Sequence, residues 1–270
     1  MTVWKVALMS DEKEIKLETA LKLAADHPAE RPEFYRILLD SSLYVLGTSG
    51  RPAGEGEVEL QAGENISIQH WEKPDGTPVI PVFSSLATLQ RAISQESEYM
   101  KLPARAFFEM TRGEGVFLNP RSDYGKEFVP EEIETMLAEG TGRLPQTRVV
   151  EKETQVLVGV PAVTPDRMLK ALSAWFAKCP GVSRAFLVLM HDPSVDDKPH
   201  YLVGVEMSGD VEEVMRGAGL VAADTSPDGQ AVDLIRLGQN DNGLDAHIRS
   251  QFTPFYVRNM KQKIMSMFGR

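Results

Sequence analysis

The carboxy-terminal half of the chain has the clearer pattern of hydrophobic and polar positions. Short apolar runs typical of buried strands alternate with stretches in which apolar residues recur every three or four positions, as in amphipathic helices. In order, the pattern predicts a strand at 156–160, a helix from 164, strands at 185–190 and 201–205, a helix from 210 and a strand at 232–237. This β-α-β-β-α-β order is that of ferredoxin-like folds.

The amino-terminal half mixes helices and strands less regularly. Asp11 and Glu14 have the spacing of a helix capping box, and apolar residues then recur at helical intervals until Pro28. The pattern next predicts a helix from 32, a strand at 43–46, a hairpin turn at 74–78, a strand at 79–83 and helices from 86 and 103. Pro81 lies inside one predicted strand, so that strand is expected at a sheet edge or a bulge.

A stretch without periodicity separates the two halves. Residues 140–154 contain glycine, proline and alternating charges, and we interpret them as a linker. We therefore predict an α+β protein of two domains and a tail. The mixed amino-terminal domain spans 1–142, the ferredoxin-like domain spans 152–257 and the helical tail spans 258–270.

Segment 115–128, which we call the signature segment, is the least generic part of the chain. A short apolar strand leads into a polar turn, and Pro130 opens a helix. The turn holds residues able to bind a carboxylate or a protein partner, namely Asn119, Arg121, Ser122, Tyr124 and Lys126. Two interpretations are open. These side chains bond the protein's own backbone, or Arg121, Lys126 and free helix amides form a recognition site.

The last residues have the pattern of a short amphipathic helix. Met260, Ile264, Met267 and Phe268 fall on one face, and the basic residues Arg258, Lys261, Lys263 and Arg270 occupy the other. Such a helix can pack on its own domain, on a second subunit or partner protein, or on a membrane surface. Its methionine-rich face favours a protein surface, since the acidic chain opposes membrane binding.

Composition narrows the class of protein. The 270 residues carry a formal net charge of -10, which disfavours nucleic-acid binding. The amino end lacks the pattern of a secretory signal, and no apolar run is long enough for a membrane helix. We therefore expect a soluble, cytoplasmic protein. The single cysteine, Cys179, cannot form an internal disulfide, and its place at a helix end disfavours a thiolate.

Few chemical motifs are present. Segment 191–200 holds His191, His200 and three carboxylates, which is one possible metal site, but its prolines and Lys198 also suit an ordinary loop. The sequence contains no phosphate-binding loop, dinucleotide fingerprint or nucleophile elbow. We therefore predict no catalytic residues, no cofactor and a non-catalytic role.

Segments along nearly the whole chain resemble the bacterial enhanced serine sensitivity protein B family. The matching pieces are 31–36, 43–47, 79–83, the signature segment, 159–161 and 253–256. The resemblance implies a two-domain cytoplasmic protein, and it implies no catalytic residues. Residues 257–270 extend beyond the family pattern.

Two functions are therefore open. The first is a regulatory or protein-interaction module that uses the signature segment and the tail to bind a protein partner or a second copy. The second is a sensor that binds an amino acid related to serine through the β-α-β-β-α-β half, because that half resembles amino-acid-binding regulatory domains of the ACT type. Those domains usually have a glycine after the first strand, where this chain has Ala162.

Overall fold

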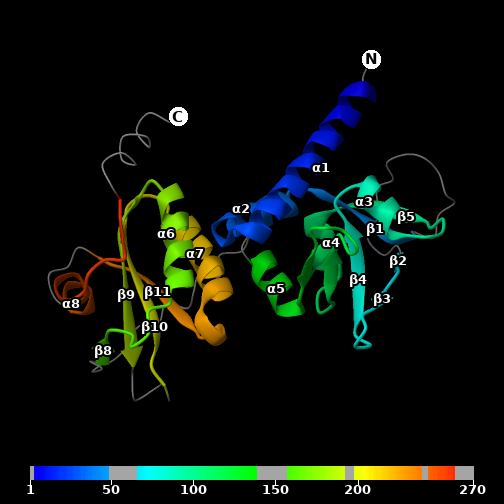
Figure 1. The fold of residues 1–270 in the computed structure, drawn as a ribbon. Coiled ribbons are helices and arrows are strands. Elements are labelled where there is room, and N and C mark those ends of the chain that lie inside the picture. The colour runs from blue at the N-terminus through cyan, green and yellow to red at the C-terminus, as the bar shows by residue number, and fades with distance from the viewer. Residues whose placement is uncertain (1–2, 49–65, 139–156, 192–197, 239–242, 259–270) are drawn as a thin grey trace. The chain divides into compact units, whose positions relative to one another are not determined.

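The computed structural model describes residues 3–48, 66–138, 157–191, 198–238 and 243–258 (Figure 1). The chain divides into two compact units. The first consists of residues 1–26 and 33–142, and the second of residues 27–32 and 143–270. Each contains helices and a β-sheet, so the prediction of an α+β protein is confirmed.

The first unit mixes short helices with short strands. Its helices are α1 (Val3–Asp26), α2 (Arg31–Leu39), α3 (Leu86–Ala92), α4 (Ala104–Met110) and α5 (Pro130–Ala138), with the first two residues of α2 assigned to the second unit. Its strands are β1 (Ser42–Thr48), β2 (Ser67–Ile68), β3 (Trp71–Glu72), β4 (Pro78–Phe83), β5 (Tyr99–Pro103), β6 (Val116–Leu118) and β7 (Lys126–Phe128).

The sheet of the first unit contains both parallel and antiparallel pairs. Among the described residues its order is β2-β1-β4-β6-β7, with β5 paired to β1 and β3 to β4. β4 and β6 run parallel, with Val82 opposite Leu118, whereas β1 is antiparallel to β4 and β7 is antiparallel to β6. The carboxyl ends of β4 and β6 therefore meet at the same edge of the sheet.

Helices cover both faces of this sheet. On one face, Leu89 and Ala92 of α3 pack with Leu46 and Phe83. On the other face, rings from α2 and α4 surround Phe128 of β7. The ring centroids of Phe34 and Phe108 lie 6.5 Å and 5.6 Å from that of Phe128. Strand alternation thus gives this sheet two buried faces.

Two sequence predictions in this unit are wrong. α1 begins at Val3, so Asp11 lies inside the helix instead of capping it, because the residues before it contain no helix breaker. Pro81 lies in a strand paired on both sides rather than at an edge. Its missing N–H is tolerated because the ladder between β4 and β1 includes only Val82 and Phe83.

The second unit contains the predicted order of elements and two more. Its strands are β8 (Leu157–Gly159), β9 (Val182–His191), β10 (His200–Met207), β11 (Val232–Arg236) and β12 (Tyr256–Val257). Its helices are α6 (Asp166–Lys178), α7 (Val211–Thr225) and α8 (Leu244–Gln251), with short 3-10 turns η1 (Pro28–Glu30) and η2 (Pro227–Gly229). The pattern of hydrophobic positions did not predict α8 and β12.

The ferredoxin-like arrangement of this unit is not confirmed. In the split unit of ferredoxin-like folds, another strand separates the two strands that flank each helix. Here the order is β11-β10-β9-β12, with β8 also on β9, so β10 and β11 are direct parallel neighbours across α7. β8 and β9, which flank α6, are antiparallel neighbours. Hydrophobic period identifies elements but not their neighbours, so the sequence pattern could not distinguish these sheets.

Three layers form the core of the second unit. α6 and α7 cover one face of the sheet, where Leu172 and Phe176 pack with Val203 and Val205. α8 covers the opposite face, where Ile248 packs in a smaller cluster of buried residues (Figure 1). Both faces of the long central strands are therefore buried, as their continuous apolar runs predict.

Residues 27–32 complete this core although they precede most of the first unit in sequence. Ala29 of η1 is buried in the same cluster as α6 and α7. On either side of it, Glu30 pairs with Lys178 of α6 and Arg31 pairs with Asp224 of α7. One buried side chain and two ion pairs therefore hold this segment on the second unit.

Candidate functional site

The carboxyl ends of the parallel strands β4 and β6 carry a buried polar contact. Ser84 follows β4 and Asn119 follows β6, and both are almost fully buried. The side-chain carbonyl of Asn119 accepts from the backbone N–H of Ser84 at 2.9 Å, and its amide donates to the Ser84 hydroxyl at 2.8 Å. In sheets with parallel strands, ligand sites commonly lie at this edge. We therefore take this edge as the candidate site.

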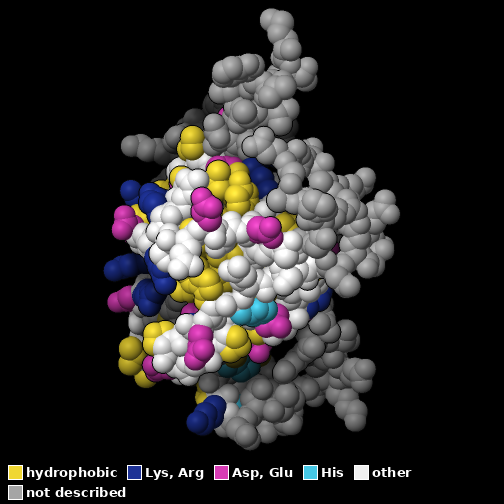
Figure 2. All heavy atoms as spheres, turned by 90° about the vertical axis from the view of Figure 1, so that its right-hand side faces the viewer, with side chains coloured by type: hydrophobic (Ala, Val, Ile, Leu, Met, Phe, Trp, Pro, Cys, Tyr) yellow, Lys and Arg dark blue, Asp and Glu magenta, His cyan; other side chains and the backbone are white. Residues whose placement is uncertain are grey.

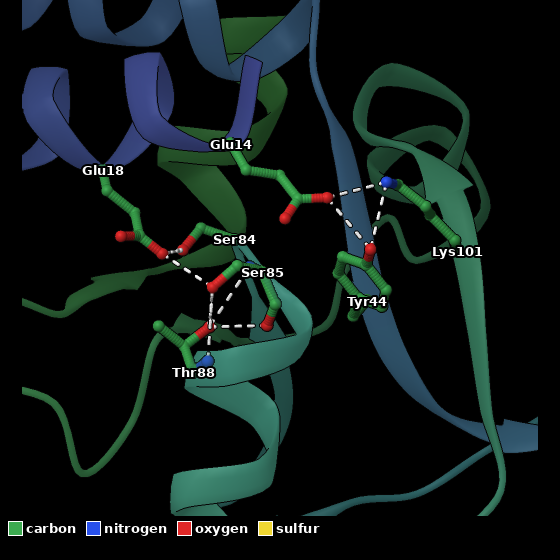
Figure 3. A network of polar contacts seen from close by, with 7 residues as sticks. All are labelled: Glu14, Glu18, Tyr44, Ser84, Ser85, Thr88 and Lys101. Carbon is green, nitrogen blue, oxygen red and sulfur yellow. Dashed lines mark hydrogen bonds and ion pairs between the residues drawn. The ribbon is translucent and has the colours of Figure 1, made fainter. Parts of the chain in front are cut away.

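Helix α1 is tied to this edge by the carboxylate of Glu18 (Figure 3). Its Oε1 atom accepts from the hydroxyls of Ser84 at 2.9 Å and Ser85 at 2.8 Å. Ser85 is also the N-cap of α3, where it forms a reciprocal capping box with Thr88. One carboxylate thus joins α1, the end of β4 and the start of α3.

One turn earlier, Glu14 makes the second polar contact of α1 with the sheet (Figure 3). It accepts from the Tyr44 hydroxyl at 2.9 Å and pairs with Lys101 at 2.8 Å. Burial raises the pKa of Tyr44. Burial alone would lower the pKa of Lys101, but hydrogen bonds to Glu14 and Tyr44 raise it overall. Both groups therefore stay protonated near neutral pH, which suits an ion pair that fixes α1 and not a general base.

The turn that follows β6 has a strained backbone. Asn119 and Arg121 have φ angles of 52° and 63°, in the left-handed region that residues other than glycine rarely adopt. Gly125 closes the turn, and a Cβ atom there would lie only 2.9 Å from the backbone carbonyl oxygen of Asn119. Such strain costs about 1–3 kcal/mol per residue and persists where surrounding contacts impose it, often at functional sites.

The outer side of this turn presents a cation and an aromatic ring. Arg121 is exposed, donates to the backbone carbonyl of Ala92 at 2.9 Å and stacks 4.9 Å from the ring centroid of Trp71. Tyr124 is 37% exposed, and its ring lies 5.4 Å from the ammonium of Lys22 on α1. Contacts with neighbouring elements therefore hold both outward side chains in place.

Lys126 does not lie in the turn, because it is the first residue of a strand. β7 starts at Lys126 and pairs antiparallel with β6, so the expected loop is a hairpin. Lys126 pairs with Glu132 of α5 at 2.8 Å, and Glu132 accepts from Tyr35 at 2.5 Å. Of the predicted recognition residues, Asn119 is therefore buried in an internal contact and Lys126 has a carboxylate partner, while Arg121 and Tyr124 are exposed and Ser122 is half-buried.

Cys179 is buried at the end of α6, as predicted. It follows α6, is buried, and donates from Sγ to the backbone carbonyl of Trp175 at 3.4 Å. Burial raises the pKa of its thiol to about 11. A thiolate nucleophile is therefore disfavoured at neutral pH.

Other candidates in the second unit lie partly outside the described residues. This holds for 192–197 of the histidine loop and for Met260, Ile264, Met267 and Phe268 of the tail. Of the described part, His200 pairs with Asp233 at 3.0 Å. In the described ranges, no group of three or more His, Cys, Asp and Glu side chains is placed to hold a metal ion. No described helix combines the length and apolarity needed to cross a membrane.

Arg258 has a different role from the one its sequence position predicts. It follows β12 and donates to the backbone carbonyls of Val182 at 2.7 Å and Phe176 at 2.8 Å, and also to that of Cys179. Two of these carbonyls belong to the end of α6, where a cation is favoured by the helix dipole. Arg258, the first residue of the predicted tail, is therefore anchored to the end of α6.

Comparisons with known proteins agree with this two-part organisation. The SseB protein N-terminal domain matches residues 17–135, and the SseB protein C-terminal domain matches residues 150–258. The Protein SseB of Escherichia coli (strain K12) and that of Shigella flexneri are each 38% identical over 250 residues, which is 93% of this chain and 94% of theirs. The chain belongs to the SseB family. No solved structure matches it significantly.

SseB membership confirms the resemblance inferred from the sequence, and the match at 17–135 includes Glu18, Ser84 and the signature segment but not Glu14. The sequence pattern predicted Asn119 and the turn but not Glu18, Ser84, Lys22 or Trp71. Ser84 and Ser85 before a helical pattern signal an N-cap. Nothing local signals that a carboxylate more than 60 residues earlier binds them.

Proposed function

We propose that this chain is a non-catalytic protein-interaction module of the SseB family and that the outer side of the signature segment binds the partner. The observation that carries the proposal is that the two sides of one turn differ: one side is fixed to the protein and the other is exposed. Its inner side is fixed by the buried contact of Asn119 with Ser84, while Arg121, whose φ is positive, and Tyr124 are exposed. Rigid scaffolds that present polar loop residues are typical of binding sites.

The chemistry of the site supports binding over catalysis. The half-buried carboxylate of Glu18 accepts from the buried hydroxyls of Ser84 and Ser85, and Glu14 is held by Tyr44 and Lys101. Arg and Tyr are the residue types enriched at protein interfaces. On the face shown in Figure 2, basic, acidic and hydrophobic side chains are interspersed, which suits a protein partner better than a nucleic acid.

Site-specific photocrosslinking in cells tests this proposal. A photoreactive phenylalanine derivative replaces Tyr124 or, as a matched control, Met110, which is 51% exposed on α4 of the same unit. We expect a discrete adduct from position 124 only, and Arg121→Ala should abolish it while leaving the melting temperature nearly unchanged. No adduct, or the same adduct from both positions, contradicts the proposal.

The amino-acid sensor is the second candidate, and its main support is weaker than the sequence indicated. That hypothesis took its fold from a ferredoxin-like arrangement, and the strand order of the second unit is different. Calorimetric titration of the full chain with serine and related amino acids tests it directly. A saturable heat of amino-acid binding that requires the second unit would support the sensor hypothesis. If no such heat is observed, only the interaction-module hypothesis is left.

A further inference from the structure

The cations that stack on aromatic rings fall into two groups. Within the described ranges, Lys101, Lys126 and Arg184 each lie over a ring and also pair with a carboxylate, at 2.8, 2.8 and 2.5 Å. Lys22 and Arg121 also lie over rings, but no described carboxylate pairs with them. Both unpaired cations stack at the turn of the signature segment. An acidic group of a binding partner would complete each of these two contacts.

Arg121 is suited to receive such a group. Its guanidinium is positioned by the Trp71 ring and by one bond to the carbonyl of Ala92, which ends α3. A guanidinium has five N–H donors, so most of them remain for an incoming carboxylate. Since its backbone and side chain are already fixed, binding costs little additional conformational entropy.

Lys22 supplies a second cation next to the same turn. α1 carries it, and the Glu18 carboxylate, one turn away, fixes α1 to the sheet. The ring of Tyr124, which is 37% exposed, adds an apolar surface beside the ammonium. This combination of two cations with an exposed ring fits a peptide that carries carboxylates and an apolar side chain.

We infer that Arg121 on Trp71 and Lys22 on Tyr124 bind an acidic peptide segment of a partner protein, one carboxylate to each cation. This inference rests on the proposed function and names the chemistry of its partner. A chain of net charge -10 repels an extended polyanion, and two cations on separate rings are too few to hold one. A short acidic segment needs only these two contacts.

The first experiment uses a phage library of random peptides selected on the full-length chain. The result expected is enrichment of Asp and Glu, with an apolar residue near them. One enriched peptide, made with a fluorescent label, is then titrated by anisotropy into wild type, Lys22→Gln, Arg121→Gln and the control Lys16→Gln. Lys16 is an exposed cation on the same helix for which the structure shows no ring contact.

Each test variant should weaken binding about 5–30-fold, the range that corresponds to one or two kcal/mol. Lys16→Gln should leave affinity unchanged, and circular dichroism should show that all variants are folded. Equal loss in Lys16→Gln, or peptides without acidic enrichment, would overturn the inference. If enriched peptides are not acidic but still crosslink to position 124, the inference fails and the proposed function stands. If none contacts that position, both fail.

Discussion

The contact between Asn119 and Ser84 allows a stability prediction that separates two physical effects. Asn119→Ala removes the acceptor of a buried backbone N–H, which costs about 1–3 kcal/mol. It also places alanine at a φ of 52°, which costs a further 1–2 kcal/mol or so. We therefore expect a loss of roughly 2–5 kcal/mol in the free energy of unfolding of the first unit.

Glycine at the same position isolates the hydrogen-bond effect, because glycine adopts positive φ without strain. Asn119→Gly should therefore be more stable than Asn119→Ala by about 1 kcal/mol. Ser122→Ala, in the same turn, is the matched control and should fall within about 0.5 kcal/mol of wild type, because the structure shows no side-chain bond for Ser122.

Urea unfolding measures all three variants. Trp71 reports on the first unit, since its ring packs 6.2 Å from that of Phe83, and hydrogen exchange of peptides from β4 and β6 assigns the loss to that sheet. An Asn119→Ala protein as stable as wild type would show that the buried contact contributes nothing. An equal loss in the free energy of unfolding of the alanine and glycine variants would refute the energetic cost assigned to alanine at a positive φ.

Four further predictions concern the second unit and its flanks. Cys179 should resist thiol reagents at neutral pH, and since burial raises its pKa to about 11, stability should fall more steeply in wild type than in Cys179→Ala as pH rises from about 9 towards 11. Tyr256→Phe should raise stability by about 1 kcal/mol in urea unfolding, because the buried Tyr256 hydroxyl has no hydrogen-bond partner among the described residues; a loss would reveal a hidden partner. Limited proteolysis should cut the chain first within 140–154, and early cuts elsewhere would contradict the predicted position of the linker. Deleting residues after Arg258 should turn an oligomer into a monomer in light scattering without lowering the melting temperature, whereas an unchanged mass would favour self-docking of the tail.

The sequence predicted elements better than the contacts between them. The helices expected from 164 and from 210 follow local patterns and were found as α6 and α7, with the side chain of Asp210 accepting from the backbone N–H of Glu213 at 3.0 Å. Lys126 was misplaced because β7 has only three residues and alternates weakly. Contacts between distant parts of the chain could not be predicted either. Neither the order of β8 to β11 nor the contact of Glu18 with Ser84 leaves a signal in the local sequence.

The small segment at 27–32 has a consequence for anyone who divides this gene. A fragment that starts in the linker contains all of β8 to β12 but lacks Ala29, together with the partners of Lys178 and Asp224. Subcloning at the apparent boundary would therefore leave an unfilled site on α6 and α7. The same holds for recombination during evolution. A crossover at the linker would transfer a domain that lacks residues 27–32 and therefore has an incomplete core.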